Sequence, residues 1–516
     1  MMAVYPPLND ILQTAEKNHL TSSSICDRIS RMQNNDFFIG RARELELLEG
    51  LWSKPSASLV VCAGRRRIGK STLIEKFAEG SRCKFIEISG LAPDEGVTDD
   101  MQRKNFCESL AEQTGRPEAL ADTWPKAFAA LADSIRGGGR TVVLLDEISW
   151  MGGLEKAFPA MLKNAWDMKF SRRPRLVFVV CGSVSAWIGK NILRSKAFVG
   201  RVSLAMDLKE LPLSDCAAFW GERAERTTPL EMLDVLSVTG GVPKYLSEMQ
   251  PRLSADENIR RMCFLPEGFL FGDFDRIFHD VFKRTAESKR RILEALADGP
   301  KTQGEVAEAT GIGAGGSLTD ALGELVAAGF VSEDRGLTPE TGKAVREVRY
   351  RICDNYVRFY LRFVAPRGEA IRKGFFRLAS MDQLPGWRSI LGTQFETLVL
   401  NNLPQIAPLL GLGNALVLSA APFVRNATKR GEGTQIDLLV QTRTALHVVE
   451  IKRRALISAS VEDEVREKIK RLRVPRGLSV RTALVYAGEL APEVAERGYF
   501  DALVPVERLL GLPVRQ

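Results

Sequence analysis

The sequence contains no apolar run that approaches the roughly 18 residues needed to span the hydrocarbon core of a bilayer. Its first 35 residues are polar and lack the apolar core of a secretory signal. The eight cysteines have no paired spacing, and the three histidines lie far apart. We therefore expect a cytoplasmic protein with reduced thiols, no membrane partner and no histidine-rich metal site.

Positive charge is concentrated near the end of the chain. Residues 372–516 hold 21 Lys and Arg against 14 Asp and Glu, whereas the formal net charge of all 516 residues is +8. Nearly all of the excess therefore lies in this quarter. Such an excess favours a polyanionic partner, with DNA or RNA as the first candidate. A solvated basic surface explains it equally well.

A glycine-rich loop follows the apolar run 58–63, which predicts a buried parallel strand. The loop matches G-x-x-x-x-G-K-[ST], whose backbone N–H groups cradle phosphates at the start of a helix. Lys70 is expected to reach the β- and γ-phosphates, and the Ser71 hydroxyl to ligate Mg²⁺. ATP and Mg²⁺ are thus the predicted cofactors, and the loop residues expected at the nucleotide are Gly64, Arg65, Arg66, Arg67, Ile68, Gly69, Lys70, Ser71 and Thr72.

Two further apolar runs end in polar residues that suit nucleotide hydrolysis. The run 141–145 leads into Asp146 and Glu147. We expect Asp146 to hold the Mg²⁺ shell and Glu147 to act as general base toward the attacking water. The run 176–181 leads into Gly182 and Ser183. Ser183 either senses the γ-phosphate or positions water, or it is an ordinary turn serine.

Composition shifts and Gly/Pro punctuation divide the chain into five parts. We expect an α/β protein with a P-loop NTPase parallel sheet, a helical lid, a winged helix and a C-terminal α/β domain, which is restriction-endonuclease-like by the resemblance that Asp437, Glu450 and Lys452 carry. The third helix of the winged helix, near 317–325, carries two acids and no base, which favours packing over reading DNA. The expected boundaries are a polar leader at 1–36, the P-loop ATPase domain at 37–208, the lid at 209–284, the winged helix at 285–365 and the nuclease-like domain at 366–516.

The last part carries a second candidate site. Residues 436–440 and 447–452 predict two strands, and positions two apart on a strand share a face, so Glu450 and Lys452 point the same way. With Asp437 on the first strand and Glu396 on an upstream helix, the pattern resembles the PD-(D/E)xK nuclease core. The resemblance implies that Asp437, Glu450 and Glu396 bind Mg²⁺ and that Lys452 orients the attacking hydroxide. A salt-bridged β-hairpin is the alternative.

The chain from about residue 36 to residue 455 also resembles a known family. The resemblance rests on the phosphate loop with its three arginines, the Asp146–Glu147 pair, Gly200–Arg201 and the turn Gly240-Gly-Val-Pro243. These motifs are typical of the archaeal-type ATPase family, in the STAND branch of AAA+ P-loop ATPases. The resemblance implies a nucleotide-driven switch in which Arg201 meets the γ-phosphate and Pro243 couples nucleotide to the lid. It also implies self-association on activation.

Two functions follow from these patterns. In the first, the ATPase controls a Mg²⁺-dependent nuclease that acts on nucleic acid. In the second, the ATPase is a regulatory scaffold whose nuclease-like domain only binds a partner or DNA. Metal-dependent cleavage of nucleic acid distinguishes the two.

Overall fold

The computed structural model describes residues 38–514, apart from residues 93, 95, 184, 283–284, 340–341, 346 and 428–431. The expected polar leader at 1–36 lies outside the described residues. Across the described residues, no helix is both long and apolar enough to span a membrane. The cysteines found there are all free, and Cys62 and Cys181 lie in the core as expected.

The N-terminal domain is built on a five-stranded parallel sheet with the order β2-β3-β4-β1-β5. Strands β1 and β4 are buried along their whole length, which explains their unbroken apolar sequences. The parallel sheet expected from the sequence is confirmed. Its strands are β1 (Ser58–Gly64), β2 (Lys84–Ser89), β3 (Thr141–Asp146), β4 (Leu176–Gly182) and β5 (Val202–Leu208).

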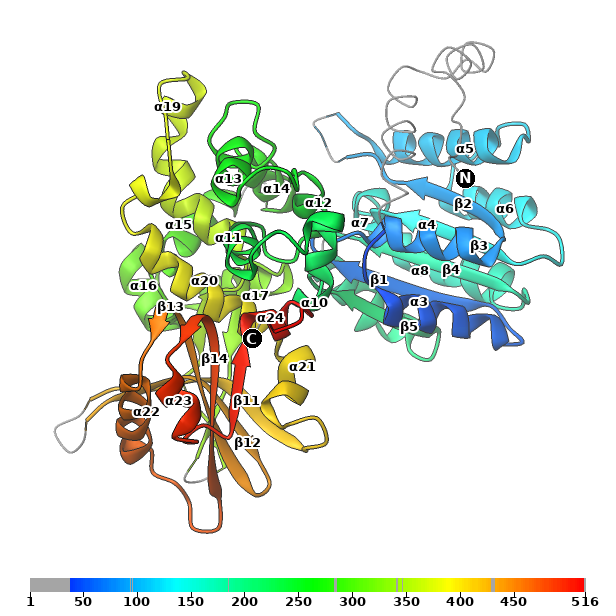
Figure 1. The fold of residues 1–516 in the computed structure, drawn as a ribbon. Coiled ribbons are helices and arrows are strands. Elements are labelled where there is room, and N and C mark those ends of the chain that lie inside the picture. Colours follow the sequence, from blue (N-terminus) through cyan, green and yellow to red (C-terminus); the bar gives the residue numbers. More distant parts are fainter. Residues whose placement is uncertain are drawn as a thin grey trace.

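Helices cover both faces of this sheet (Figure 1). One face packs in a cluster that includes Phe77 of α4, and the other in a cluster that includes Phe106, Trp124 and Phe158 of α5, α6 and α8. The sheet is therefore the middle layer of three. The helices are α3 (Ala42–Glu49), α4 (Lys70–Ser81), α5 (Asp99–Thr114), α6 (Trp124–Ser134), α7 (Ile148–Met151), α8 (Phe158–Ala165) and α9 (Ser185–Ile188).

A helical lid follows the sheet. Its first helix begins after Pro212, and a 3-10 helix, η5 (Ala217–Arg223), continues it. Gly240 at a φ of 58° ends α11, and Pro243 begins the next helix in its first turn. The lid helices are α10 (Leu213–Cys216), α11 (Pro229–Thr239), α12 (Pro243–Ser247), α13 (Ala255–Cys263) and α14 (Asp273–Phe282).

A three-helix segment comes next, with an antiparallel sheet of order β6-β10-β7. Its third helix buries Leu318, Leu322 and Leu325 and leaves Asp320 and Glu324 exposed, as a packing helix does. The elements are α15 (Ala286–Leu296), β6 (Lys301–Thr302), α16 (Gln303–Thr310), α17 (Gly316–Ala327), β7 (Val331–Asp334), β8 (Leu337–Thr338), β9 (Lys343–Ala344) and β10 (Arg349–Ile352).

Two short helices, α18 (Asn355–Phe359) and α19 (Gly368–Arg372), lead into the C-terminal domain. Its sheet has the order β11-β12-β13-β14-β15, with antiparallel pairing up to β13 and parallel pairing beyond it. The elements are α20 (Trp387–Asn401), α21 (Leu403–Ile406), β11 (Val417–Arg425), β12 (Thr434–Thr442), β13 (Ala445–Ile457), α22 (Ser460–Arg471), β14 (Ser479–Leu490), α23 (Pro492–Glu496), β15 (Ala502–Pro505) and α24 (Val506–Leu509).

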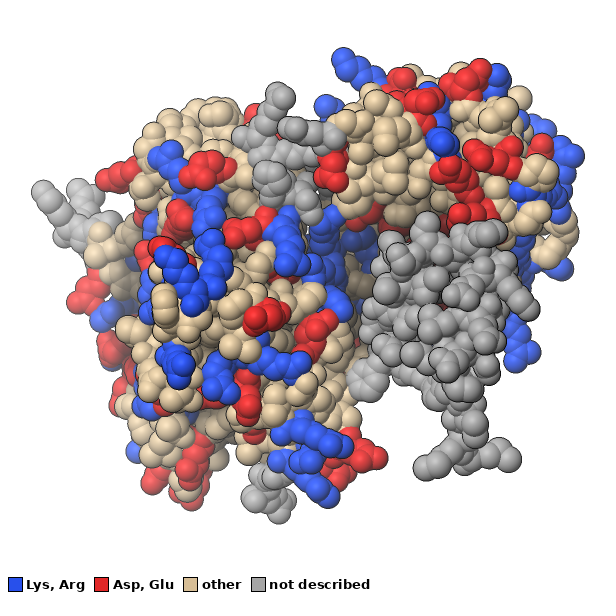
Figure 2. All heavy atoms as spheres, turned by 90° about the horizontal axis from the view of Figure 1, so that it is seen from above, with Lys and Arg blue, Asp and Glu red and all other residues tan. Residues whose placement is uncertain are grey.

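The lid and the C-terminal domain share a core. One apolar cluster joins Leu233 and Leu236 of α11 to Phe395 of α20, Val449 of β13 and Leu509 of α24. The N-terminal domain lies to one side of this body (Figure 1). Seen from above, on the side away from the C-terminal sheet, basic and acidic side chains are interspersed (Figure 2). Because Leu233 and Leu236 of α11 lie in the shared core, the lid packs directly against the C-terminal domain.

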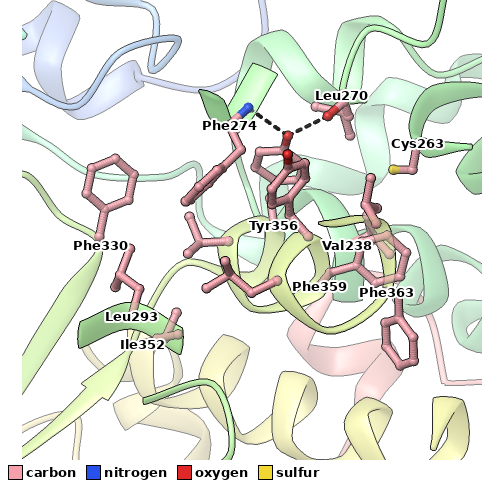
Figure 3. Packing of buried hydrophobic residues seen from close by; sticks show 14 of the residues in the cluster. Val238, Cys263, Leu270, Phe274, Leu293, Phe330, Ile352, Tyr356, Phe359 and Phe363 are labelled. Carbon is pink, nitrogen blue, oxygen red and sulfur yellow. Dashed lines mark hydrogen bonds between the residues drawn. The ribbon is translucent and has the colours of Figure 1, made fainter. Parts of the chain in front are cut away.

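A buried tyrosine ties the lid to α18. The Tyr356 hydroxyl donates a hydrogen bond to the Leu270 carbonyl and accepts one from the Phe274 N–H, with an N···O distance of 3.0 Å (Figure 3). Tyr356 is 1% exposed. Its hydroxyl satisfies two backbone groups that water cannot reach, so it fixes the start of α14 on α18.

We expect Tyr356→Phe to lower the free energy of unfolding by about 1–3 kcal/mol, because two buried backbone groups lose their partner. Urea denaturation followed by circular dichroism measures the change. Tyr360→Phe is the matched control, since the Tyr360 hydroxyl contacts Asp275, whose side chain is 60% exposed. Equal losses in the two variants would contradict this account.

Candidate functional site

The glycine-rich loop connects β1 to α4 in a shape that needs its glycines. Gly64 has a φ of 151°, and a Cβ there would lie 2.6 Å from the Leu208 carbonyl oxygen of the neighbouring strand. Gly69 has a φ of 84° and stands directly before α4. Both conformations are unfavourable for other residues. The loop is therefore held open above the N-terminus of α4, where backbone N–H groups attract anions.

A cavity of about 340 Å³ opens over this loop. The N-terminal domain contributes the loop, the end of β3 and the segment before α3, and the lid contributes Phe219, Pro243, Lys244 and Ser247. Apolar side chains from Phe38, Ile39 and Phe219 lie among the lining residues, beside charged ones. The predicted site residues in the lining are Arg66, Arg67, Ile68, Gly69, Lys70, Ser71, Thr72, Asp146, Glu147 and Pro243.

The predicted phosphate and magnesium ligands lie together. Lys70 Nζ donates to the Arg65 carbonyl at 3.0 Å, within the loop itself. Ser71 Oγ donates to Oδ2 of Asp146, the last residue of β3, at 2.6 Å. A hydroxyl and a carboxylate at this contact are the oxygen donors that Mg²⁺ prefers, so the two residues fit a magnesium ion.

Glu147 and Ser183 are also brought together. The Glu147 carboxylate accepts hydrogen bonds from the Ser183 N–H at 3.1 Å and from the Ser183 hydroxyl at 2.8 Å. Glu147 itself has a φ of 45°, an uncommon conformation for a residue with a side chain. The end of β4 thus fixes the direction of the Glu147 carboxylate, which lines the cavity beside Asp146.

The three loop arginines reach outward to other parts of the protein. Arg65 lies 3.1 Å from Glu210 and 2.7 Å from Asp354, and it is not among the residues that line the nucleotide cavity. The Arg67 guanidinium lies 2.5 Å from Asp273 at the start of α14. The Arg66 guanidinium lies 4.8 Å from the centre of the Trp150 ring. The sequence indicated nucleotide contacts for all three but gave no sign of these partners.

Glu210 lies where the loop meets the lid. It accepts a hydrogen bond from the Gly241 N–H at 2.9 Å, and a Cβ on Gly240 would lie 2.6 Å from its Oε2. Burial raises the pKa of Glu210 to about 7; Arg65 opposes this shift and Asp354 adds to it. The Gly-Gly-Val-Pro turn is therefore packed directly against the carboxylate that holds Arg65.

The pKa of Glu210 predicts a pH dependence of stability. Below about pH 4.5 the carboxyl is protonated in both states. Between that value and about pH 7 only the unfolded state releases the proton, so the free energy of unfolding falls as pH rises, by at most about 3 kcal/mol. We expect Glu210→Gln to have a smaller slope of stability against pH than wild type in denaturation measured from pH 4.5 to 7.5. Exposed Glu222 serves as control, and Glu222→Gln should keep the wild-type slope; a slope of equal size in wild type and Glu210→Gln would refute the assignment.

The family-implied residues Pro243 and Arg201 have different surroundings. Pro243 lines the cavity, and the N–H of neighbouring Lys244 lies 3.4 Å from the Arg67 carbonyl oxygen. Arg201 is not among the residues that line the cavity. It pairs with Asp167 at 2.7 Å and 2.9 Å and lowers the pKa of that carboxyl to about 2. The γ-phosphate role of Arg201 stays a prediction.

The second candidate site lies on β12 and β13. Asp437 Oδ2 accepts a hydrogen bond from the Ile451 N–H at 2.9 Å, so Asp437 stands beside Glu450 and Lys452. Glu450 is fully buried, and Lys452 Nζ lies 2.6 Å from its Oε1. Lys468 of α22, which sequence reasoning missed within a basic helix, lies 2.7 Å from both Glu450 oxygens and 3.9 Å from Asp437.

Glu396 of α20 completes this neighbourhood. Burial, followed by the charge of Asp437, raises the pKa of Glu396 to about 7. Burial and Glu450 raise the pKa of Asp437. These carboxylates are suitable metal donors, but in the described part of the chain no three His, Cys, Asp or Glu side chains converge closely enough to hold a metal ion. Two ammonium groups neutralise Glu450 in this conformation, so a metal at Glu450 requires Lys468 to move.

Several basic residues of the C-terminal domain have partners within the protein. Arg453 pairs with Asp234 of α11, Arg454 with Glu464, and Lys470 with Glu467. Arg466 stacks on the Tyr499 ring, with 4.1 Å between the guanidinium and the ring centre. Much of the positive charge of the C-terminal domain therefore stabilises its own structure.

Comparison with known proteins places the first site in a family. Residues 38–249 match an ATPase domain predominantly from Archaea. An uncharacterized protein of Methanocaldococcus jannaschii is 24% identical over 363 residues, 70% of this chain and 75% of that protein. An uncharacterized ATP-binding protein of the same organism is 47% identical over 51 residues, 10% of this chain and 86% of that one. A Walker-type ATPase of Pyrococcus abyssi has a TM-score of 0.47 at 18% identity, covering 63% of this chain and 96% of its own. Residues 38–249 thus form an ATPase domain of the archaeal type.

Proposed function

We propose that the chain is an ATP-hydrolysing switch whose nucleotide state controls a metal-dependent phosphodiesterase site in the C-terminal domain. The observation that carries the first half is the cavity over the phosphate loop. There Ser71 meets Asp146, and Glu147 is oriented by Ser183. The carboxylates, the hydroxyl groups and the N-terminus of α4 meet at one point, as they do in sites that bind and cleave a phosphate anhydride.

Each residue of the cavity has a distinct role in this proposal. Lys70 leaves the Arg65 carbonyl and binds the β- and γ-phosphate oxygens. Ser71 and Asp146 hold Mg²⁺, which neutralises the charge that develops on those oxygens. Glu147 accepts the proton of the attacking water, and Ser183 keeps the carboxylate turned toward it. The apolar lining at Phe38, Ile39 and Phe219 suits a purine base.

We expect Glu147→Gln to bind ATP normally and to hydrolyse it at least about tenfold more slowly, because the amide cannot accept the proton. Lys70→Ala should lose binding as well, since Lys70 begins α4 directly after the loop and its ammonium is the group expected at the β- and γ-phosphates. Thermal stabilisation by ATP with Mg²⁺ reports binding, and steady-state phosphate release reports hydrolysis. Unchanged release in Glu147→Gln, or full stabilisation in Lys70→Ala, would overturn these roles.

The contacts that join the phosphate loop to the lid and to α18 support control of the C-terminal site by nucleotide. Arg65 joins the phosphate loop to Asp354, the N-cap of α18, and Arg67 joins it to Asp273 of the lid helix α14. On the other side of the lid, Asp234 of α11 pairs with Arg453, next to Lys452. Since α11 leads into the turn that ends at Pro243, a shift of this turn upon nucleotide binding bears on both sites.

The order of elements in the C-terminal domain supports the nuclease-like half of the proposal. Helix α20 precedes three antiparallel strands, α22 and a parallel strand, and the second and third strands carry Asp437, Glu450 and Lys452. In this proposal Asp437, Glu450 and Glu396 hold Mg²⁺, and Lys452 orients the attacking hydroxide. The segment 286–352 serves as a winged helix whose third helix packs instead of reading DNA.

We expect Asp437→Asn, Glu450→Gln and Lys452→Met each to reduce Mn²⁺-dependent cleavage of DNA or RNA by about 100-fold or more, the usual effect of removing such groups. Glu467→Gln is the control. Glu467 lies at a half-exposed position of α22, the helix that carries Lys468, and its substitution should leave cleavage unchanged. ATP binding should persist in all four. Cleavage that survives the three substitutions would show that the site lies elsewhere.

One observation favours a second function. Lys452 and Lys468 together neutralise Glu450, as in a salt-bridged structural element. In that case the C-terminal domain binds a partner or nucleic acid without cutting it, and ATP controls a scaffold. Wild-type protein that cleaves neither DNA nor RNA, single-stranded or double-stranded, with any divalent metal supports this reading.

Self-association belongs to the same proposal. Arg201 lies outside its own nucleotide cavity and is 30% exposed beside Asp167. We propose that copies of the chain assemble and that Arg201 of one copy contacts the γ-phosphate bound in the cavity of the next copy. Chromatography of the Glu147→Gln protein with ATP tests for such an assembly.

A further inference from the structure

A second cavity, of about 380 Å³, lies between the three-helix segment and the C-terminal domain. Glu396 and Asp437, two of the proposed metal ligands, lie on its C-terminal wall. The opposite wall comes from β7 to β10, with Arg351 of β10, and from Arg358 of α18. Two of the proposed metal ligands therefore face a cavity between two parts of the chain, and its opposite wall carries arginines; Glu450 and Lys452 are not among the lining residues.

Arg358 is a buried cation with neutral partners. It is 3% exposed, and its guanidinium donates to Gln394 Oε1 at 2.6 Å, to Thr397 Oγ1 at 2.9 Å and to the Ile352 carbonyl. Its Nε is a buried donor with no partner. Among the residues that the structure describes, no carboxylate forms an ion pair with it. The charges of Glu396 and Asp354 act on Arg358 without direct contact; a buried guanidinium without an ion-pair partner is costly, and a bound anion reduces that cost.

Arg351 adds a second donor at the same wall. Its Nε donates to both Asp334 carboxylate oxygens, at 3.1 Å and 3.0 Å, while its buried Nη1 has no partner. Burial, and then the charge of Arg351, lower the pKa of Arg358 to about 10. Two neighbouring guanidinium groups, each with one unused donor, match the oxygens of a phosphate group.

We propose that Arg351 and Arg358 bind a phosphate group of a nucleic-acid strand in this cavity and present it to Glu396 and Asp437. This inference rests on the proposed phosphodiesterase function of the C-terminal domain. Two strands of a duplex do not fit in about 380 Å³, the low end of ordinary ligand pockets, so the substrate enters as a single-stranded end. A bound phosphate draws the two unused donors toward the cavity.

The cavity also contains carboxylates, and they set a condition on phosphate binding. Besides Glu396 and Asp437 they are Asp298, Asp334 and Glu347. Asp298 and Asp334 are paired with Arg362 and Arg351. The charge of Glu396 and Asp437 repels phosphate until a divalent cation neutralises it. Phosphate and metal must therefore bind synergistically, each raising the affinity for the other.

The test uses the full chain and a fluorescent single-stranded oligonucleotide with a 5′-phosphate, with Ca²⁺ as the metal. Fluorescence anisotropy measures binding. We expect Ca²⁺ to strengthen binding, and Arg351→Gln and Arg358→Lys each to weaken it at least about tenfold, the effect of losing a charge-assisted hydrogen bond. Arg335→Gln is the matched control, because it removes the same charge from an exposed position of the same segment and should bind as wild type.

Competitors identify the source of the phosphate. A single strand should compete far better than a blunt duplex of the same sequence or inorganic phosphate; equal competition by the duplex, or complete displacement by millimolar phosphate alone, overturns the inference. Equal binding by wild type and both arginine variants also overturns it. Thermal melting shows whether each variant folds, and if Arg358→Lys does not, Arg351→Gln decides.

A separate measurement distinguishes this failure from failure of the proposed function. Titration calorimetry measures Mn²⁺ binding to ATP-free wild-type protein and to Asp437→Asn. If wild type binds Mn²⁺ and Asp437→Asn does not, but the arginine variants bind the oligonucleotide normally, only the phosphate site is wrong. If Asp437→Asn binds Mn²⁺ as wild type does, both the metal site and this inference fall.

Discussion

The structure depends on one buried ion pair network, in which Arg65 of the phosphate loop lies between Glu210 and Asp354. Glu210 lies shortly before α10, the first helix of the lid. Asp354 caps α18 by accepting a hydrogen bond from the Val357 N–H. One guanidinium thus joins the loop, the lid and the helix that leads to the C-terminal domain. Removing it would leave two carboxylates buried without their counter-charge, which is far more costly than losing a surface pair.

The same network connects the cavity over the phosphate loop to the second candidate site in the C-terminal domain. From Asp354, helix α18 places Tyr356 on α14 and Arg358 on α20. Helix α20 carries Glu396, and its apolar face packs in the core that the lid shares with the C-terminal sheet. Coupling between sites requires a contiguous element that both can bias, and α18 satisfies the structural part of that requirement.

The sequence predicted those features that depend on local pattern. Buried parallel strands need unbroken apolar runs, so the strands before Gly64, Asp146 and Ser183 were evident, and the two-residue period placed Glu450 and Lys452 on one face. Contacts between residues far apart in the chain leave no such pattern. The partners of Arg65, the pairing of Arg201 with Asp167, and the position of Lys468 on Glu450 depend on how the domains pack.

The outward contacts of the loop arginines have a thermodynamic consequence. They hold the phosphate loop in shape through contacts within the protein, which lowers the conformational entropy that ATP binding must overcome there. They also limit what ATP can do, because a ligand shifts an equilibrium only by the difference in its affinity for the two states. If Arg67 exchanges Asp273 for a phosphate oxygen, the work available to move the lid is the difference between those two ion pairs, and not the full binding energy of ATP.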